Sequence, residues 1–245
     1  MSRRRLISVT SPAFNEGKNL AKMTKEIEEV MGVLKNFDYE YIIVDDGSTD
    51  NTWGEITRIA KQNKKVRGVR LTRNFGQQIA ITAGIDMAKG DAVIYCDSDL
   101  QHPPSLFPKL IEKWKKGAKI VHTRRLETKG ISFLKNLMSK IFYAFANALS
   151  DIKVEGGMAD FKLLDKEVYS KLKSMKEKNR FLRGMVSWMG YPFAIVDYRA
   201  RKRMAGQPWY NFSRNLEFAK IGILSLSTKP LKYISYLGLF LIVSS

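Results

Sequence analysis

Short apolar runs along this chain alternate with longer segments in which apolar residues recur every three or four positions. The runs predict β-strands and the longer segments predict α-helices, because strand side chains alternate between two faces whereas helical side chains return to one face. The expected strands are residues 6–11, 39–44, 66–71, 92–95 and 118–121, with helices beginning near residues 17, 52, 77 and 104. This alternation predicts an α/β fold with a mainly parallel central sheet flanked by helices.

Polar clusters follow each of the first four expected strands. Carboxyl ends of parallel strands meet at one edge of the sheet, where open α/β proteins bind ligands. Each cluster alone also fits turn or helix-cap chemistry, which favours Asp and Asn. Their convergence on one edge predicts a binding site. The clusters are Asn15 and Glu16, Asp45 and Asp46, Arg73 and Asn74, and Asp97 with Ser98 and Asp99.

The fourth cluster carries the chemistry of a metal site. Asp97, Asp99 and Gln101 offer carboxylate and amide oxygens within five positions. Oxygen ligands suit a hard divalent cation such as Mg²⁺ or Mn²⁺, which keeps positions free for phosphate. Neither a Gly-x-Gly-x-x-Gly run after the first strand nor a Gly-Lys-Ser/Thr loop is present. A nucleotide would therefore be held by other means.

Composition changes the expected partners. The chain has 42 Lys and Arg against 24 Asp and Glu, a formal charge of +18, which favours a phosphate-rich partner or an anionic membrane surface. Nucleic acid is not the expected partner, because four acidic or polar strand ends would repel a phosphate backbone. One cysteine, Cys96, excludes an intrachain disulfide, and the N-terminus lacks the apolar core of a signal peptide. A reducing compartment is expected.

Basic residues after the fifth expected strand are candidates for holding a second anion. Arg124 and Arg125 end that strand, and the amphipathic segment 131–149 carries Lys135 and Ser139 one turn apart on a narrow polar stripe. These residues could bind a phosphate group. Alternatively, the arginines are solvated surface residues, and segment 131–149 is an ordinary packed helix with one solvent-exposed face.

The C-terminal part predicts membrane association. An apolar segment, 216–226, precedes Lys229 and Lys232, and residues 233–245 carry no charge. Thirteen residues are too few to span a bilayer, which takes about 20 as a helix, so we expect the start of a transmembrane segment, through which a homo-oligomer could form. Lysines before it place the catalytic part on the cytoplasmic face. We therefore expect a catalytic domain over 1–215 and membrane-associated helices over 216–245; a buried C-terminal helix is the alternative.

Several motifs resemble those of the inverting family-2 glycosyltransferases with the GT-A (Rossmann-like) fold. They are Pro-Ala-Phe-Asn-Glu at 12–16, Val-Asp-Asp-Gly-Ser-Thr-Asp at 44–50 and Asp-Ser-Asp at 97–99. Arg-Asn-Phe-Gly at 73–76, Asp-Leu-Gln at 99–101, Asp-Phe-Lys-Leu-Leu at 160–164 and Arg-Phe-Leu-Arg-Gly at 180–184 are similar to the polyprenyl-phosphate branch, which is dolichol-phosphate mannose synthase-like.

The resemblance implies transfer of a sugar from a UDP-sugar or GDP-mannose to undecaprenyl or dolichyl phosphate, with inversion. It implies that Asp97, Asp99 and Asp160 are the catalytic acids, that Asp97, Asp99 and Gln101 bind Mg²⁺ or Mn²⁺, and that Asp160 orients the acceptor or a basic residue. It also implies that the acceptor phosphate is held by Arg124, Arg125, Lys135 and Ser139. The implied nucleotide-sugar residues are Pro12, Ala13, Asn15, Glu16, Asp45, Asp46, Arg73, Asn74, Ser98 and Arg203.

Two other functions remain open from the residues. One is a family-2 transferase that acts on a sugar hydroxyl in polysaccharide or glycolipid synthesis; such enzymes carry a Gln-x-x-Arg-Trp motif, which this chain lacks. The other is a non-enzymatic nucleotide or nucleic-acid binder, which the charge alone would allow. A screen of sugar-nucleotide donors distinguishes them.

Overall fold

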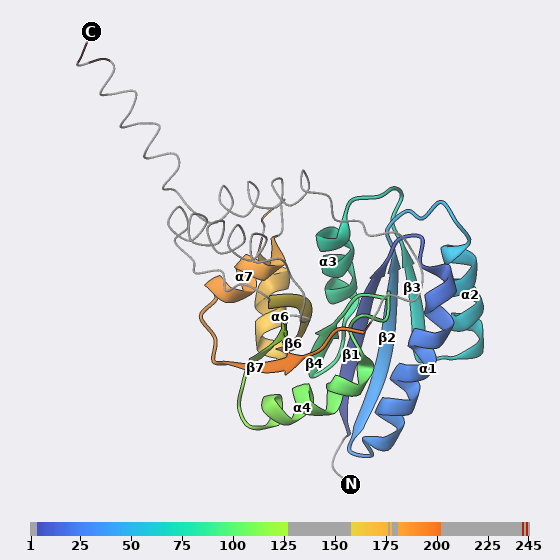
Figure 1. Ribbon diagram of the computed structural model, residues 1–245, viewed down its shortest axis with the longest axis horizontal. Coiled ribbons are helices and arrows are strands. Elements are labelled where there is room, and N and C mark those ends of the chain that lie inside the picture. Colours follow the sequence, from blue (N-terminus) through green and yellow to red (C-terminus); the bar gives the residue numbers. More distant parts are fainter. Residues whose placement is uncertain are drawn as a thin grey trace. The chain divides into compact units, whose positions relative to one another are not determined.

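The structure is a computed structural model that describes residues 4–126, 158–175, 177, 181–201, 242 and 244. A seven-stranded sheet with helices on both faces forms its centre (Figure 1). The described elements are β1 (Arg5–Ala13), α1 (Gly17–Val33), β2 (Phe37–Asp45), α2 (Thr52–Gln62), β3 (Val66–Arg70), α3 (Gln77–Met87), β4 (Ala92–Tyr95), η1 (Pro104–Leu106), α4 (Phe107–Lys115), β5 (Ile120–Arg125), β6 (Met158–Asp165), α6 (Lys166–Ser174), α7 (Leu182–Trp188) and β7 (Phe193–Tyr198).

The strand order is β3-β2-β1-β4-β6-β5-β7. Strand β6 runs antiparallel to both of its neighbours, β4 and β5, while the other pairs are parallel. Six strands therefore end at one edge of the sheet, and β6 begins there. The α/β class and the mainly parallel sheet predicted from the sequence are confirmed.

The core follows from the alternation of side chains along the strands. Ile7 and Val9 of β1 are fully buried in one apolar cluster, which α1, α2 and α4 complete. Ser8 and Thr10 alternate with them and face the opposite side, where α3 and α6 pack. Burial of β1 on both faces is typical of a central strand in an α/β sheet.

Helix α3 approaches β1 very closely at Gly84. A Cβ at this position would lie 1.8 Å from Thr10 Oγ1 and 2.9 Å from Thr10 Cβ. Only a glycine lets the helix backbone come so near the sheet. The start of α3 is thereby held at the carboxyl edge of the strands.

The fifth strand differs from its prediction. The expected span, 118–121, is displaced to Ile120–Arg125, so that Arg124 and Arg125 lie inside β5 as its last two residues. The reason is that β5 pairs along its length with β6 and β7, and these hydrogen bonds stabilise polar positions that apolar patterning does not mark.

The chain forms two compact units. The first contains the whole sheet with α1, α2, α3, α4 and α6; in the second the structure describes α7 and residues 242 and 244. The predicted boundary near residue 216, the helix over 131–149 and the membrane-associated segment 216–245 fall outside the described residues. Among the helices that are described, none combines the length and the apolar character that a membrane crossing requires.

Candidate active site

Two carboxylates face each other across neighbouring strands at the carboxyl edge. Antiparallel pairing of β4 with β6 places Tyr95 opposite Lys162. Two residues beyond each of these positions, the register brings Asp97 next to Asp160. The predicted catalytic acids thus come together although they are far apart in the sequence, because β6 enters the edge where β4 leaves it.

The loop after β4 is held in a defined conformation by its own polar groups. The Asp97 N–H donates to His102 Nδ1 at 3.0 Å, and the Gln101 N–H donates to Asp99 Oδ1 at 3.0 Å. Ser98 Oγ donates to the Pro12 carbonyl oxygen at 2.8 Å, which ties the loop to β1. These bonds fix the direction in which both carboxylates leave the backbone.

The side chain of His102 supports this loop. Its ring stacks on Phe161 at a centroid distance of 5.2 Å and meets the edge of Tyr198 at 5.9 Å. Burial lowers the pKa of His102 to about 4, so the ring is neutral at pH 7 and its Nδ1 can accept a hydrogen bond. From the sequence alone, this structural role of His102 was missed.

The electrostatics of the acids fit a cation. Burial raises the pKa of Asp97 well above its usual value, and the charges of Asp99 and Asp160 raise it further. Carboxylates that disfavour each other's ionisation are stabilised by a nearby positive charge. Among the described residues, no three His, Cys, Asp or Glu side chains converge as a preformed metal site. Asp97 and Asp99 with the amide of Gln101 stay the predicted ligands, and their oxygen donors suit Mg²⁺ or Mn²⁺.

Asn15 joins the end of β1 to the loop after β2. Its backbone has a φ of +56°, and its Oδ1 accepts the Thr49 N–H at 2.9 Å and the Asp50 N–H at 3.3 Å. Beside it, the Glu16 N–H donates to Thr52 Oγ1 at 3.0 Å, at the start of α2. Both residues lie at the edge of the sheet predicted from the sequence. The Asn15 side chain stabilises a turn, which was the alternative explanation for this cluster.

The two aspartates that end β2 have different surroundings. Asp45 Oδ1 accepts the Ser48 N–H at 3.0 Å, while its buried Oδ2 has no hydrogen-bond partner among the described residues and lies 3.5 Å from Arg70 Nε. Asp46 receives the N–H groups of Phe75 and Gly76, at 2.8 and 2.9 Å, one on each carboxylate oxygen. Burial raises the pKa of Asp46, and these two bonds oppose that shift.

The loop after β3 packs directly on the loop after β2. A Cβ on Gly47, whose φ is +67°, would lie 2.3 Å from the carbonyl carbon of Arg73. The Arg73 guanidinium lies over the Phe75 ring, 4.4 Å from its centroid, and both side chains are exposed. Arg73 and Asn74 are therefore at the predicted edge, beside Asp46.

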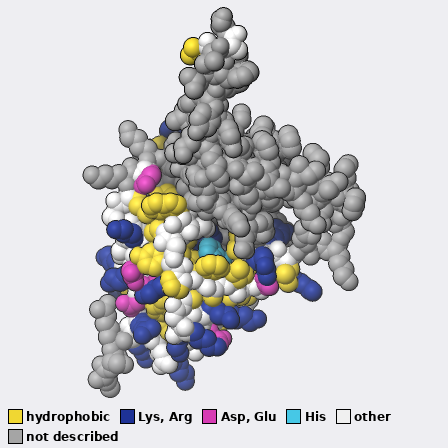
Figure 2. Space-filling model, turned by 90° about the vertical axis from the view of Figure 1, so that its left-hand side faces the viewer, with side chains coloured by type: hydrophobic (Ala, Val, Ile, Leu, Met, Phe, Trp, Pro, Cys, Tyr) yellow, Lys and Arg dark blue, Asp and Glu magenta, His cyan; other side chains and the backbone are white. Residues whose placement is uncertain are grey.

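Arg124 and Arg125 occupy the same edge but project to opposite faces, because successive strand residues alternate. Arg124 makes a bidentate ion pair with Asp197 of β7, with N–O distances of 2.7 and 3.0 Å. Arg125 lies close enough to the acidic cluster that its charge lowers the pKa of His102. Their binding of an acceptor phosphate stays a prediction. On the face seen in Figure 2, Lys and Arg side chains are interspersed with apolar and acidic ones.

Some of the remaining predicted site residues are described by the structure, and others lie outside the described residues. Pro12 and Ala13 end β1 at the site edge. Lys135, Ser139 and Arg203 lie outside the described residues. Two glutamines at the start of α3 were missed: Gln77 Nε2 donates to Asp97 Oδ1 at 2.5 Å and Gln78 Nε2 to Asp160 Oδ2 at 3.2 Å. The rule that polar residues beyond a strand gather at one edge could have identified them.

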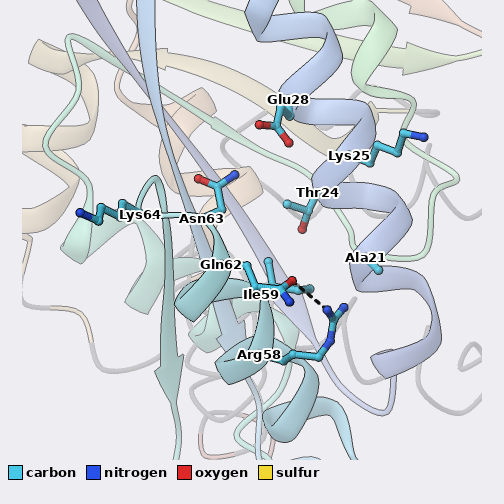
Figure 3. A pocket seen from close by; sticks show the side chains of 9 residues that line it. All are labelled: Ala21, Thr24, Lys25, Glu28, Arg58, Ile59, Gln62, Asn63 and Lys64. Carbon is cyan, nitrogen blue, oxygen red and sulfur yellow. Dashed lines mark hydrogen bonds between the residues drawn. The ribbon is translucent and has the colours of Figure 1, made fainter.

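A groove of about 380 Å³ lies elsewhere, between α1 and α2 (Figure 3). Thr24 and Lys25 of α1 and Arg58 and Gln62 of α2 are among the residues that line it, and Arg58 Nη1 donates to Gln62 Oε1 at 2.9 Å. None of the predicted site residues lines it. The carboxyl edge of the sheet, not this groove, holds the candidate chemistry.

Comparison with known proteins shows what this chain resembles. The family model described as glycosyl transferase family 2 matches residues 8–173. An uncharacterized glycosyltransferase, YkcC of Bacillus subtilis, is 38% identical over 241 residues, covering 98% of this chain and 74% of that protein. A prophage bactoprenol glucosyl transferase homolog of Escherichia coli is 38% identical over 236 residues, covering 95% of this chain and 76% of its own length.

Solved structures share the fold at low identity. The mannosyltransferase PcManGT of Pyrobaculum calidifontis, in complex with GDP-Man and Mn²⁺, aligns with a TM-score of 0.56 at 17% identity, over 83% of this chain and 59% of that one. Glucosyl-3-phosphoglycerate synthase of Mycobacterium tuberculosis, with Mn²⁺ and UDP, aligns with a TM-score of 0.58 at 18% identity, over 89% and 77%. Family match, relatives and the GT-A architecture agree that this chain belongs to glycosyl transferase family 2 and is a glycosyltransferase.

Proposed function

We propose that this glycosyltransferase moves a sugar from a UDP-sugar or GDP-mannose to a polyprenyl phosphate, with inversion at the anomeric carbon. The observation that carries the proposal is 38% identity, over almost the whole chain, to several bactoprenol glucosyl transferases, among them that of Shigella phage SfV. The names of the solved neighbours, with GDP-Man, UDP and Mn²⁺, support a nucleotide-sugar donor and a divalent cation.

The residues of the site fit the demands of this reaction. A phosphate oxygen of the acceptor attacks the anomeric carbon while the bond to the nucleotide diphosphate breaks. The acceptor needs no general base, since the second pKa of a phosphate monoester is about 6. The main demand is stabilisation of charge on the departing diphosphate. Mg²⁺ or Mn²⁺ held by Asp97, Asp99 and Gln101 would supply it.

The other roles follow from position along the edge. The ends of β1, β2 and β3, with Asp45, Asp46 and Arg73, would receive the nucleoside. Arg124 and Arg125 of β5, with Lys135 and Ser139, would receive the lipid phosphate. Arg203 would lie over the diphosphate, and Asp160 between the two substrates would orient the acceptor.

A donor screen tests the proposal. The purified full chain is incubated with Mn²⁺, a polyprenyl phosphate and UDP-glucose, other UDP-sugars or GDP-mannose in turn, and the lipid fraction is analysed by mass spectrometry. We expect one donor to give a polyprenyl-phosphate hexose. Unphosphorylated polyprenol and a free sugar serve as control acceptors. Product on the free sugar alone would replace the proposal with transfer to a sugar hydroxyl.

We also propose that the protein is membrane-associated with its catalytic part on the cytoplasmic face. Two apolar segments, 216–226 and 233–245, flank lysines, and each Lys or Arg near an anionic surface adds about 1 kcal/mol of attraction. Flotation with anionic liposomes should weaken as salt rises without vanishing, and deletion of 233–245 should lower it at every salt concentration. Failure of the full chain to float at low salt would refute the association.

A further inference from the structure

Two consecutive glutamines connect the start of α3 to both acids of the site. Gln77 reaches Asp97, which follows β4, and Gln78 reaches Asp160, at the start of β6. The two acids belong to neighbouring antiparallel strands, so the amides hold two separate segments from a single helix turn. No other described helix begins with side chains bonded to both acids.

The first turn of α3 is itself fixed in place. Asp46 receives the N–H groups of Phe75 and Gly76 immediately before the helix, and Gly84 seats the helix against Thr10 two turns further on. Gln77 and Gln78 are therefore carried by backbone that is held at both ends. A support of this kind can hold carboxylates in one orientation more precisely than a loop.

The chemistry of an amide suits this task. An amide N–H donates a hydrogen bond to a carboxylate oxygen without adding a charge. A lysine or arginine in its place would form an ion pair with the same carboxylate and compete with a metal ion for it. Asp97 Oδ2 also lies 3.5 Å from His102 Nδ1, but that nitrogen accepts the Asp97 N–H and has no proton to offer. Gln77 thus orients Asp97 through Oδ1.

We propose that Gln77 and Gln78 are positioning residues: Gln77 holds Asp97 in the orientation that binds the divalent cation, and Gln78 holds Asp160 in the orientation that receives the acceptor. The inference rests on the proposed metal-dependent transfer. It adds residues that act through the acidic side chains of the site and not by contact with the substrates. Outer partners of metal ligands commonly change metal affinity by about 10–100-fold when they are removed.

A Mn²⁺-binding titration tests the positioning role directly and does not depend on enzymatic activity. Free Mn²⁺ is followed by electron paramagnetic resonance during titration of the full chain, with and without UDP or GDP. We expect Gln77→Leu to weaken Mn²⁺ binding about tenfold. Gln78→Leu should leave Mn²⁺ binding nearly unchanged and raise KM for the lipid phosphate, because its partner Asp160 is placed beside the acceptor. The matched control, Gln62→Leu, removes an exposed amide of α2 that lies in the groove described above and should leave the affinity unchanged.

Two further readouts separate positioning from general damage to the fold. Saturating Mn²⁺ should restore kcat of Gln77→Leu, while the Mn²⁺ concentration for half-maximal rate rises about tenfold, as the lost affinity requires. Gln77→Lys should bind Mn²⁺ more weakly than Gln77→Leu, because it adds a competing cation. Circular dichroism and thermal melting verify folding, and Gln78→Leu tests the proposal if Gln77→Leu does not fold.

The outcomes are distinct from those of the donor screen. A Mn²⁺ affinity of Gln77→Leu within about twofold of the wild type, or an unchanged KM for the lipid phosphate in Gln78→Leu, would overturn the positioning role while the transferase proposal stands. A wild-type chain that binds no Mn²⁺ even with nucleotide would also overturn it. Absence of any lipid-linked sugar, with Mn²⁺ binding intact and sensitive to Gln77, would refute the proposed function alone.

Discussion

Replacement of Gly84 by alanine tests the close approach of α3 to the sheet. The added Cβ would lie 1.8 Å from Thr10 Oγ1, 2.9 Å from Thr10 Cβ and 3.3 Å from Val44 Cγ2. Rotation of the Thr10 side chain relieves the first contact but not the second, since Cβ belongs to the backbone frame of β1. The helix must therefore move away from the strand, and its first turn moves with it.

The magnitude follows from two opposing terms. Overpacking in a core costs about 1–3 kcal/mol, whereas alanine in place of glycine in a helix gains about 1 kcal/mol. We expect Gly84→Ala to lower the free energy of unfolding by about 0–2 kcal/mol, the difference between these terms. The same substitution at Gly32 of α1, where a Cβ meets nothing within 4 Å, should raise it by up to about 1 kcal/mol.

Urea denaturation followed by circular dichroism measures both changes. Thr10→Ala completes a double-mutant cycle with Gly84→Ala. It is a suitable partner because Thr10 Oγ1 is buried without a hydrogen-bond partner among the described residues, so its removal breaks no hydrogen bond. In the double variant the new methyl group of residue 84 occupies space that Thr10 vacates, so about 1 kcal/mol should be recovered. Equal or higher stability of Gly84→Ala relative to Gly32→Ala would refute the packing argument.

Three further predictions concern the site and the charges near it. Asp99→Asn, or EDTA, should remove most turnover while the chain stays folded, and full activity in EDTA would exclude the metal role. Arg124→Ala and Lys135→Ala should raise KM for the lipid phosphate more than for the sugar nucleotide; an equal effect of Asp197→Ala would reduce Arg124 to an ion-pair partner of β7. Burial and the neighbouring charge of Lys162 lower the pKa of His122 to about 3. Between pH 6.5, the ordinary pKa of histidine, and about pH 3, residue 122 is protonated in the unfolded chain but not in the folded one, so the stability of the protein falls as the pH falls. In urea titrations over this pH range, His122→Leu should lose less stability than the wild type.

Much of the fold was predictable because the first four strands are short, apolar and separated by helices of ten or more residues. Their positions agree with the structure to within a few residues, and the polar clusters that follow them do share an edge. The direction of β6 was not predictable, since a short run such as 161–164, which is apolar except for Lys162, pairs equally well in either direction. Asp160 was therefore placed by resemblance to the family, not by sheet geometry.

The candidate site was predicted in composition better than in contacts. Residue type indicated that Asn15 and Asp46 belong at the edge, but it does not show that their oxygens accept backbone N–H groups of neighbouring loops. Nor does it show which carboxylate an amide will reach, and so Gln77 and Gln78 were overlooked. Such partners depend on how loops after different strands pack, which local sequence does not encode.

The antiparallel course of β6 has a consequence for how this enzyme can diversify. The register pairs Arg124, near the end of β5, with Met158, the first residue of β6. The segment between these strands therefore leaves and re-enters the sheet at adjacent points, and the pairing places no restriction on its length. Insertions, deletions or wholesale exchange there would leave Asp160 in register with Asp97. Evolution or protein engineering can thus vary that segment while the strand ends of the candidate site stay unchanged.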